Sequence, residues 1–245
     1  YHAIKAGDAD VVVAGGVESV TRTQGKSLPE DERNPRFTDR SRSDFVCERW
    51  IPMGLTAENV AERWGISRRQ QDELAKLSQD RAVAAQDNGF FAREIVPYTL
   101  PDGTVVTMDD GPRRGTTLEK LAQLQPAFKP DGTVTAGNSC PLNDGAAAVL
   151  VMSEERARAL GLQPLARILA STATGVAPEI MGVGPIAAIG KALAQTKMTI
   201  GDVDVVEFNE AFASQVLAVC QDVGISVEDQ LKRSSTRANV AIALP

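Results

Sequence analysis

Histidine and cysteine are scarce in this sequence, and their scarcity excludes several kinds of site. Of 245 residues only His2 is a histidine, so a mechanism that needs a histidine elsewhere is excluded for this polypeptide. The three cysteines, Cys47, Cys140 and Cys220, are widely spaced and form no CxxC pair. The sequence therefore supports neither a disulfide framework nor a zinc site, and we expect reduced thiols and no bound metal.

Long apolar runs and excess positive charge are also lacking. No stretch approaches the ~20 apolar residues that a membrane-spanning helix requires, and the N-terminal residues YHAIKAGDAD show no signal-peptide core. The net charge of −6 argues against general binding of nucleic acid, which needs a basic surface. We expect a globular cytoplasmic protein with no nucleic-acid or membrane partner, although an anionic cofactor stays compatible with locally placed positive groups.

The first half of the chain shows one strand, a long polar stretch and two helices. Residues 1–16 read as the end of a helix, a turn at Gly7, and a strand closed by the glycine pair 15–16. Residues 21–45 have almost no apolar periodicity and predict a long surface loop. Thr56 is predicted to cap a helix that ends at Gly65, and the capping box that starts at Ser67 predicts a second helix that stops at Asn88.

The second half alternates strands and helices. After a β-rich stretch at 95–100, residues 146–152 predict a fully buried strand, and Ser153 begins a helix. Residues 166–175 predict another strand, a helix follows from Pro185, and residues 203–208 predict a further strand. This alternation is typical of an α/β domain with crossover connections.

Asn209 is the leading candidate for a functional residue. It lies between the predicted strand 203–208 and a helix with Phe212, Val216 and Val219 inward, where α/β folds gather exposed donors. One interpretation is an ordinary N-cap, because asparagine is among the best capping residues. The other is a side-chain amide that holds a water and helps to form an oxyanion hole; the two roles do not compete.

The second candidate is the segment from Asn138 to Gly145, which is also what an ordinary tight loop uses. Gly145 and the alanines after it allow close backbone approach. Cys140 has no histidine partner, so a nucleophilic role is disfavoured, and Cys220 on an apolar stretch is predicted to be a buried structural thiol. The glycine pair 15–16 lacks the remaining G-x-x-G spacing, which disfavours a nicotinamide enzyme.

Taken together and in order, a set of motifs resembles the thiolases, the acetyl-CoA acetyltransferases and 3-ketoacyl-CoA thiolases. They are AGGVES, MGLTAENVAERW, GTVTAGNSCPLNDGAAAVLVMS, MGVGPIAAIGKAL and VVEFNEAFA. The resemblance implies an α/β protein with the layered αβαβα thiolase fold, here incomplete, with an inserted loop domain. Residues 1–16 would end the N-terminal half, 17–141 would form the loop domain, 142–160 would return to the first half, and 161–245 would be part of the C-terminal half.

The resemblance also implies a chemistry, a thioester Claisen condensation or its reverse. A cysteine takes the acyl group, a second cysteine moves a proton, and oxyanion holes stabilise the intermediates. The substrate would be a coenzyme A (CoA) thioester, with no permanently bound cofactor, and the intact protein would be a homodimer or homotetramer.

The family's site residues carry over onto matching positions. The asparagine of the NEAFA motif, which holds a catalytic water, corresponds to Asn209. The residues that would line the CoA and acyl pocket are Met53, Phe128, Ala136, Ala211 and Phe212. Cys140 stands where the family usually has a CoA-contacting serine, so that contact would be weakened or altered.

The sequence departs from the family at its ends. The nucleophilic cysteine would precede Tyr1, and the second catalytic cysteine would follow Pro245. The family's glycine- and histidine-bearing segment corresponds to SSTRANVAIALP, in which Leu244 stands at the histidine or the Gly-His pair is omitted. We therefore expect no thiolase turnover from this chain alone, and exposed strand edges with poor solubility or marginal stability.

Three hypotheses account for these departures. The chain is a segment of a thiolase-family acyltransferase, and the abrupt loss of resemblance after Asp229 favours a reading-frame fault over gradual divergence. Alternatively it is a non-catalytic acyl-CoA-binding or interaction protein derived from a thiolase, or a subunit completed by a partner chain.

Overall fold

The structure is a computed structural model. It describes residues 1–23, the single positions 36, 39, 41, 42 and 44, and residues 51–227 and 240–243. Most of the predicted surface loop 21–45, Cys47 and Leu244 lie outside the described residues. Within the described part, no helix combines the length and the apolar character needed to cross a membrane.

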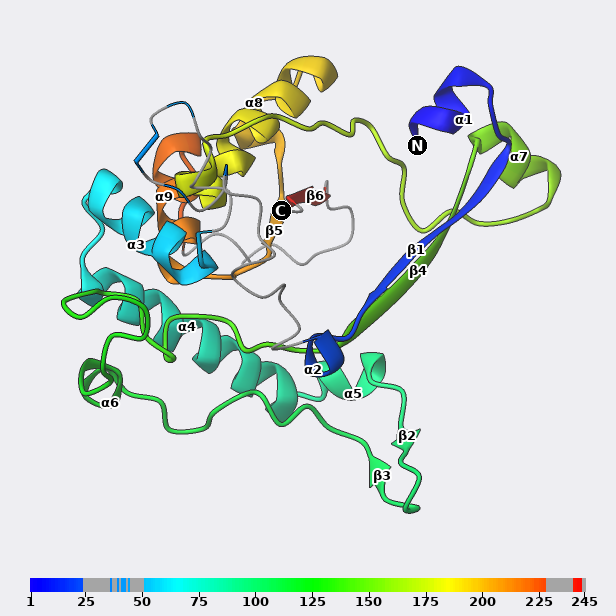
Figure 1. Cartoon of the computed structure of the whole chain (residues 1–245). Coiled ribbons are helices and arrows are strands. Elements are labelled where there is room, and N and C mark those ends of the chain that lie inside the picture. The colour runs from blue at the N-terminus through cyan, green and yellow to red at the C-terminus, as the bar shows by residue number, and fades with distance from the viewer. Residues whose placement is uncertain are drawn as a thin grey trace.

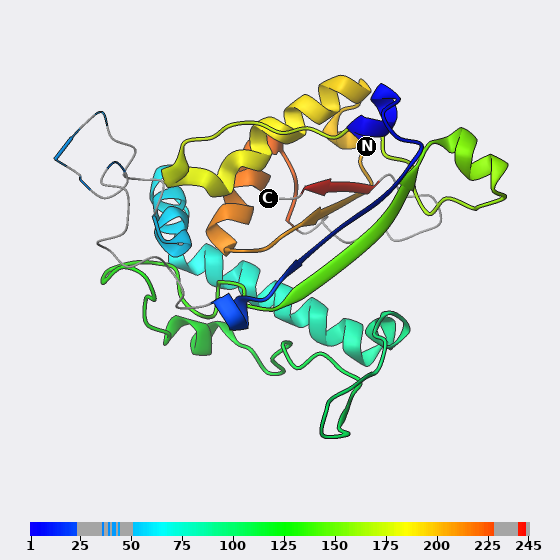
Figure 2. The same cartoon turned by 45° about the vertical axis from the view of Figure 1, so that its right-hand side comes forward.

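A two-stranded antiparallel ribbon joins the early and middle parts of the chain. Strand β1 (Val11–Glu18) pairs with β4 (Gly145–Met152), with Val11 opposite Met152 and Glu18 opposite Gly145. At Gly15 a side chain would not fit, because a Cβ would lie 2.8 Å from the Ala147 carbonyl oxygen. The ribbon carries α1 (His2–Ala6) and α7 (Glu154–Ala159) at one end and α2 (Val20–Thr23) at the other (Figure 1 and Figure 2).

The prediction that strand 146–152 is fully buried is wrong for the described structure. Val149 is 59% exposed and Leu150 is 56% exposed. In the sheet formed by the described residues, β1 is the one partner of β4, and neither face of the ribbon is covered along most of its length. The strand β1 also continues beyond the glycine pair 15–16, since glycine is tolerated in a strand where backbones approach closely.

Two helices frame one side of the core. Helix α3 (Met53–Trp64) begins three residues before the predicted cap, with Pro52 at the N-cap position. Thr56 lies inside the helix, where its hydroxyl donates to the Met53 carbonyl at 2.6 Å, so the prediction that it caps the helix is wrong. The helix ends as predicted at Gly65, whose φ of 66° lies in the left-handed region.

Helix α4 (Arg68–Asp87) follows the sequence prediction at both ends. Ser67 and Gln70 form the predicted capping box, each side chain bonding to the main chain of the other residue. Asn88 is the C-cap, as predicted.

The predicted strand at 166–175 is wrong. These residues have no regular structure and lie along α8 (Gly184–Thr196), where the Thr172 hydroxyl donates to the Ala188 carbonyl at 2.9 Å. A helix has no ladder of main-chain partners to offer, so the segment cannot become a strand here. The remaining short elements are α5 (Phe90–Glu94), β2 (Tyr98–Thr99), β3 (Val105–Val106), α6 (Leu118–Ala122), η4 (Pro178–Val183) and η5 (Ile200–Asp202).

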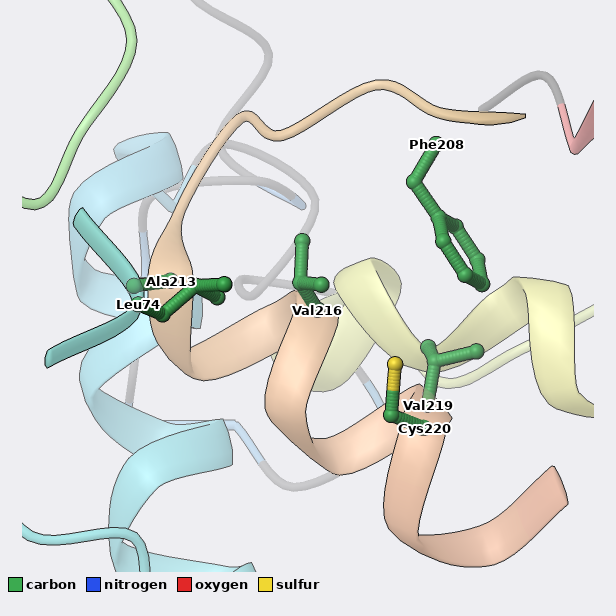
Figure 3. Packing of buried hydrophobic residues seen from close by; sticks show 6 residues of the cluster. All are labelled: Leu74, Phe208, Ala213, Val216, Val219 and Cys220. Carbon is green, nitrogen blue, oxygen red and sulfur yellow. The ribbon is translucent and has the colours of Figure 1, made fainter. Parts of the chain in front are cut away.

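The core is centred on α9 (Ala213–Val223), which packs against α3, α4, α8 and η4. Strand β5 (Val205–Phe208) pairs in parallel with β6 (Val240–Ala243) beside it. Figure 3 shows the main buried cluster, in which Phe208 of β5 and Leu74 of α4 approach the apolar side of α9. The α9 residues of the cluster are Ala213, Val216, Val219 and Cys220, so Cys220 is buried as predicted. This packing fixes the junction between β5 and α9.

Candidate functional site

Asn209 follows the last residue of β5, but it does not cap the next helix. The N-cap position of α9 is Phe212, with an extended backbone and no side-chain cap hydrogen bond. The capping interpretation of Asn209 is therefore wrong, because residues 210–212 lie between it and the first residue of the helix. Asn209 itself is exposed.

This connection is bonded to the second candidate segment. The Cys140 main-chain N–H donates to the Ala211 carbonyl at 2.9 Å, and the Ala213 N–H donates to the Asn138 carbonyl at 3.0 Å. Between them, Ser139 and Phe212 form an antiparallel bridge. The pairing holds residues 138–140 against residues 211–213, so two motifs that are far apart in sequence meet. We call these two paired segments the paired strip.

A groove of about 460 Å³ opens beside the paired strip. Its walls are one side of α4, residues 137–141, residues 206–210 and Ala213. Asn209 and Cys140 both line it, and Cys140 is an exposed free thiol. The groove therefore presents an amide and a thiol, the two chemistry-bearing side chains that the sequence singled out.

A short hydrogen bond ties the groove wall to the NEAFA motif. The Ser78 hydroxyl of α4 donates to Glu210 Oε2 at 2.6 Å. This bond joins the residue after Asn209 to the opposite wall. Across the described residues, no cluster of three or more potential metal ligands is found.

The aromatic candidates form a second group beside the groove. The rings of Phe128 and Phe212 meet edge to face, with centroids 6.1 Å apart. A Cβ on Gly54 would lie 2.2 Å from Phe128 ring atoms, so the start of α3 packs directly against that ring. Phe128 is 41% exposed and Met53 is 49% exposed.

The predicted site residues are thus brought together in part. Asn209 and Cys140 line the groove, and Ala211 and Phe212 belong to the paired strip. Phe128 contacts Phe212, whereas Met53, Phe128 and Ala136 are not part of the groove lining. Their contact with a ligand remains a prediction.

Sequence reasoning missed a network of buried polar side chains behind the groove. Glu58 on α3 is 3% exposed, and its carboxylate accepts from the Thr133 and Val134 main-chain N–H groups, each at 2.9 Å. Asp72 on α4 is also 3% exposed and accepts from the Asn138 amide at 3.0 Å. Buried charges are stable only with such partners, but their partners are distant in sequence and no local pattern reveals them.

Asp144, at the end of the second motif, has a different role. Its carboxylate accepts from the Thr21 main-chain N–H and hydroxyl, each at 2.9 Å, and from the Ser19 hydroxyl at 3.1 Å. These donors, with the Thr21 main-chain N–H the largest cause, lower the pKa of Asp144 below its ordinary value. The carboxylate thereby ties the residue before β4 to Ser19 and to the start of α2.

Comparison with known proteins covers both halves of the chain. The family model described as Thiolase, N-terminal domain, matches residues 1–155, and the one described as Thiolase, C-terminal domain, matches residues 162–241. A probable acetyl-CoA acyltransferase of Staphylococcus epidermidis is 47% identical over 235 residues, which cover 91% of this chain and 59% of that protein. A β-ketoadipyl-CoA thiolase of Acinetobacter baylyi is 46% identical over 241 residues, covering 93% and 60%.

Solved structures agree with these relatives. The dimeric peroxisomal thiolase of Saccharomyces cerevisiae matches with a TM-score of 0.84 and 40% identity, covering 93% of this chain and 58% of that chain. An acetyl-CoA acetyltransferase of Bacillus anthracis matches with a TM-score of 0.76 and 42% identity, covering 93% and 60%. The chain spans about three-fifths of the length of the proteins it matches. The predicted α/β fold class is confirmed by these structures.

Proposed function

The chain belongs to the thiolase family, and from that premise we propose that it forms part of a CoA thioester site in a protein that condenses or cleaves acyl-CoA. The observation that carries the proposal is the shared groove of Asn209 and Cys140. The motifs around Cys140 and Asn209 are far apart in sequence, and main-chain hydrogen bonds bring them together there. A binding site needs residues from separate motifs in one place, whereas an ordinary loop and an ordinary helix cap need no such contact between motifs.

In this proposal Asn209 acts on the thioester oxygen. A side-chain amide offers two N–H donors and one acceptor, so it can hold a water and direct it at a carbonyl that gains negative charge. Cys140 contacts the pantetheine arm, and its thiol is a weaker donor than the hydroxyl usual in the family. The apolar residues Met53, Phe128, Ala136, Ala211 and Phe212 contact the pantetheine arm and the acyl chain.

We propose that the chain of 245 residues binds CoA thioesters without turning them over. Its one histidine, His2, lies on α1, where its ring meets Tyr1 at 5.0 Å, and it does not line the groove. An imidazole at that place cannot donate to an oxyanion at Asn209. The same observation favours a second candidate function, an acyl-CoA-binding protein without catalysis.

The remaining expectations belong to this proposal. The intact protein would use no permanently bound cofactor, assemble as a homodimer or homotetramer, and act in the cytoplasm. The solved thiolase of S. cerevisiae is described as dimeric, which supports the first form of assembly. The division into residues 1–16, 17–141, 142–160 and 161–245 stays a prediction.

Calorimetric titration of the purified chain tests the proposal. We expect binding of acetoacetyl-CoA, with Asn209→Ala weakening it about 3- to 10-fold, the effect of one lost hydrogen bond. Free CoA lacks the thioester oxygen, so its affinity should change less. Asn88→Ala is the matched control, because Asn88 is an exposed asparagine at the end of α4, outside the groove.

Two results would contradict the proposal. Absence of binding of both CoA and acetoacetyl-CoA by a folded chain removes the assigned site. Thiolytic cleavage of acetoacetyl-CoA by the same preparation contradicts the claim of binding without turnover and leaves the site in place.

A further inference from the structure

We propose that Asn138 is a positioning residue: its buried side chain sets the place of the paired strip and thereby the spacing of the Cys140 thiol and Asn209. This inference rests on the proposed function only for the identity of the ligand. The placement itself follows from contacts within the chain.

Asn138 is 4% exposed, and both the oxygen and the nitrogen of its side-chain amide form hydrogen bonds. Oδ1 accepts from the Thr135 main-chain N–H at 2.8 Å. Nδ2 donates to Asp72 Oδ1 at 3.0 Å and to the Thr133 carbonyl at 3.1 Å. The bonds to Thr133 and Thr135 are local and could belong to any loop, whereas the bond to Asp72 joins this loop to a helix that is remote in sequence.

The Asp72 carboxylate is itself held in place. Arg68 Nε donates to Asp72 Oδ2 at 2.8 Å, and Arg68 Nη2 donates to the carbonyl oxygens of Leu121 at 2.5 Å and Leu124 at 3.1 Å. A carboxylate only accepts hydrogen bonds, so the amide nitrogen of Asn138 must face it and the orientation of the amide is fixed. A continuous chain of bonds thus runs from α6 through α4 to the groove.

The main chain of Asn138 joins this fixed side chain to the segment that borders the groove. Its carbonyl accepts from the Ala213 N–H at 3.0 Å, and two residues later Cys140 donates to the Ala211 carbonyl. The paired strip therefore cannot move relative to α4 unless the amide leaves Asp72. Because α4 also forms the opposite wall of the groove, this contact holds residues 138–140 in place against that wall, while the Ser78–Glu210 hydrogen bond joins the residue after Asn209 to it.

Asn138→Asp is the sharpest test, since it keeps the shape of the side chain and removes its N–H donor. The new carboxylate would face Asp72 at hydrogen-bond distance, where two ionised carboxylates repel and the pair holds a proton more readily than either carboxylate alone. Other charged groups also surround the site. They are Arg68 on the far side of Asp72, Glu58 beyond Thr133, and Glu207 and Glu210 in the groove.

The expected result depends on pH with a defined sign. At about pH 8 the carboxylates repel, and we expect acetoacetyl-CoA to bind about 10-fold more weakly than to the wild type. The repulsion raises the pKa of the pair, so a shared proton returns as the pH falls towards about 5 and restores the hydrogen bond. Affinity relative to the wild type should recover over the same range.

A double variant and a control separate positioning from simple destabilisation. Asp72→Asn with Asn138→Asp exchanges the amide and the carboxylate, and should regain part of the affinity at about pH 8. Ser214→Ala removes another buried hydrogen bond, from the Ser214 hydroxyl to the Ala57 carbonyl at 2.9 Å, at a place outside the groove. It should lower the melting temperature without any pH-dependent change in affinity.

Amide hydrogen exchange measures how well the main-chain hydrogen bonds of the paired strip are protected, with no ligand present. We expect Asn138→Asp to lower the protection of the Cys140 and Ala213 amides about 10-fold at about pH 8, with recovery at about pH 5. If the wild type binds no CoA thioester while this loss occurs, the proposed function fails and the positioning role stands. Wild-type affinity and protection in Asn138→Asp at about pH 8, or losses that neither acid nor the double variant reverses, would overturn the inference.

Discussion

Gly54 is the position at which one added methyl group tests the packing of the aromatic pair. A Cβ built there lies 2.2 Å from atoms of the Phe128 ring, far inside contact distance. The ring must move, and the edge-to-face contact of Phe128 with Phe212, now 6.1 Å between centroids, is lost. Overpacking of this kind costs about 1 to 3 kcal/mol and the aromatic pair contributes about 0.5 to 1.5 kcal/mol. After the roughly 1 kcal/mol by which a helix favours alanine over glycine is set against these costs, Gly54→Ala should lower the free energy of unfolding by roughly 0.5 to 3.5 kcal/mol.

Removing the ring should reverse the sign of this effect. In a Phe128→Ala background the added methyl group has space, and alanine is favoured over glycine in a helix by roughly 1 kcal/mol. Gly54→Ala should then be neutral or stabilising. Urea denaturation of the four proteins of this cycle measures the coupling between the two positions. Equal effects of Gly54→Ala in both backgrounds would refute the reasoning, because the penalty would then have no connection with Phe128.

Two further predictions concern a helix start and a carboxylate. Ser67→Ala removes the capping box of α4 and should cost about 1 kcal/mol of stability in the same denaturation assay, while a substitution of the exposed Arg69 beside it should cost less. Asp144 has a lowered pKa when folded, chiefly through the Thr21 main-chain N–H, so its contribution to stability is present above the unfolded value of about 3.9 and is lost as the pH falls through the lower folded value. The melting temperatures of the wild type and Asp144→Asn should differ at neutral pH and converge in acid; a constant difference would contradict this.

Local sequence signals predicted the structure where the stabilising partner is close in sequence. The capping box at Ser67 and the left-handed C-cap at Gly65 were correct because each is completed within a few residues. Thr56 misled because a threonine hydroxyl can bond to a carbonyl inside a helix as well as to the N–H groups at its start. Asn209 misled for another reason: Ala211 and Ala213 bond to the main chain of Cys140 and Asn138, and α9 begins only at Ala213.

The site required information that no local pattern contains. The motifs placed Asn209 and Cys140 as candidates, and the structure brings both to one groove. No local pattern singles out Asp72, since its partner Asn138 is remote in sequence. Strand 146–152 read as buried because its composition is apolar, yet burial depends on what covers the strand rather than on the strand itself.

The ribbon of β1 and β4 has a consequence for the order of folding. Its register joins Val11 to Met152 and Glu18 to Gly145, so it can pair only after the intervening chain has closed into one long loop. Loop closure costs conformational entropy before the strand-pairing hydrogen bonds can stabilise the ribbon. Contacts between residues so distant in sequence therefore form slowly. The amides of α4, whose bonds are local, should therefore gain protection early in refolding, and those of the ribbon late.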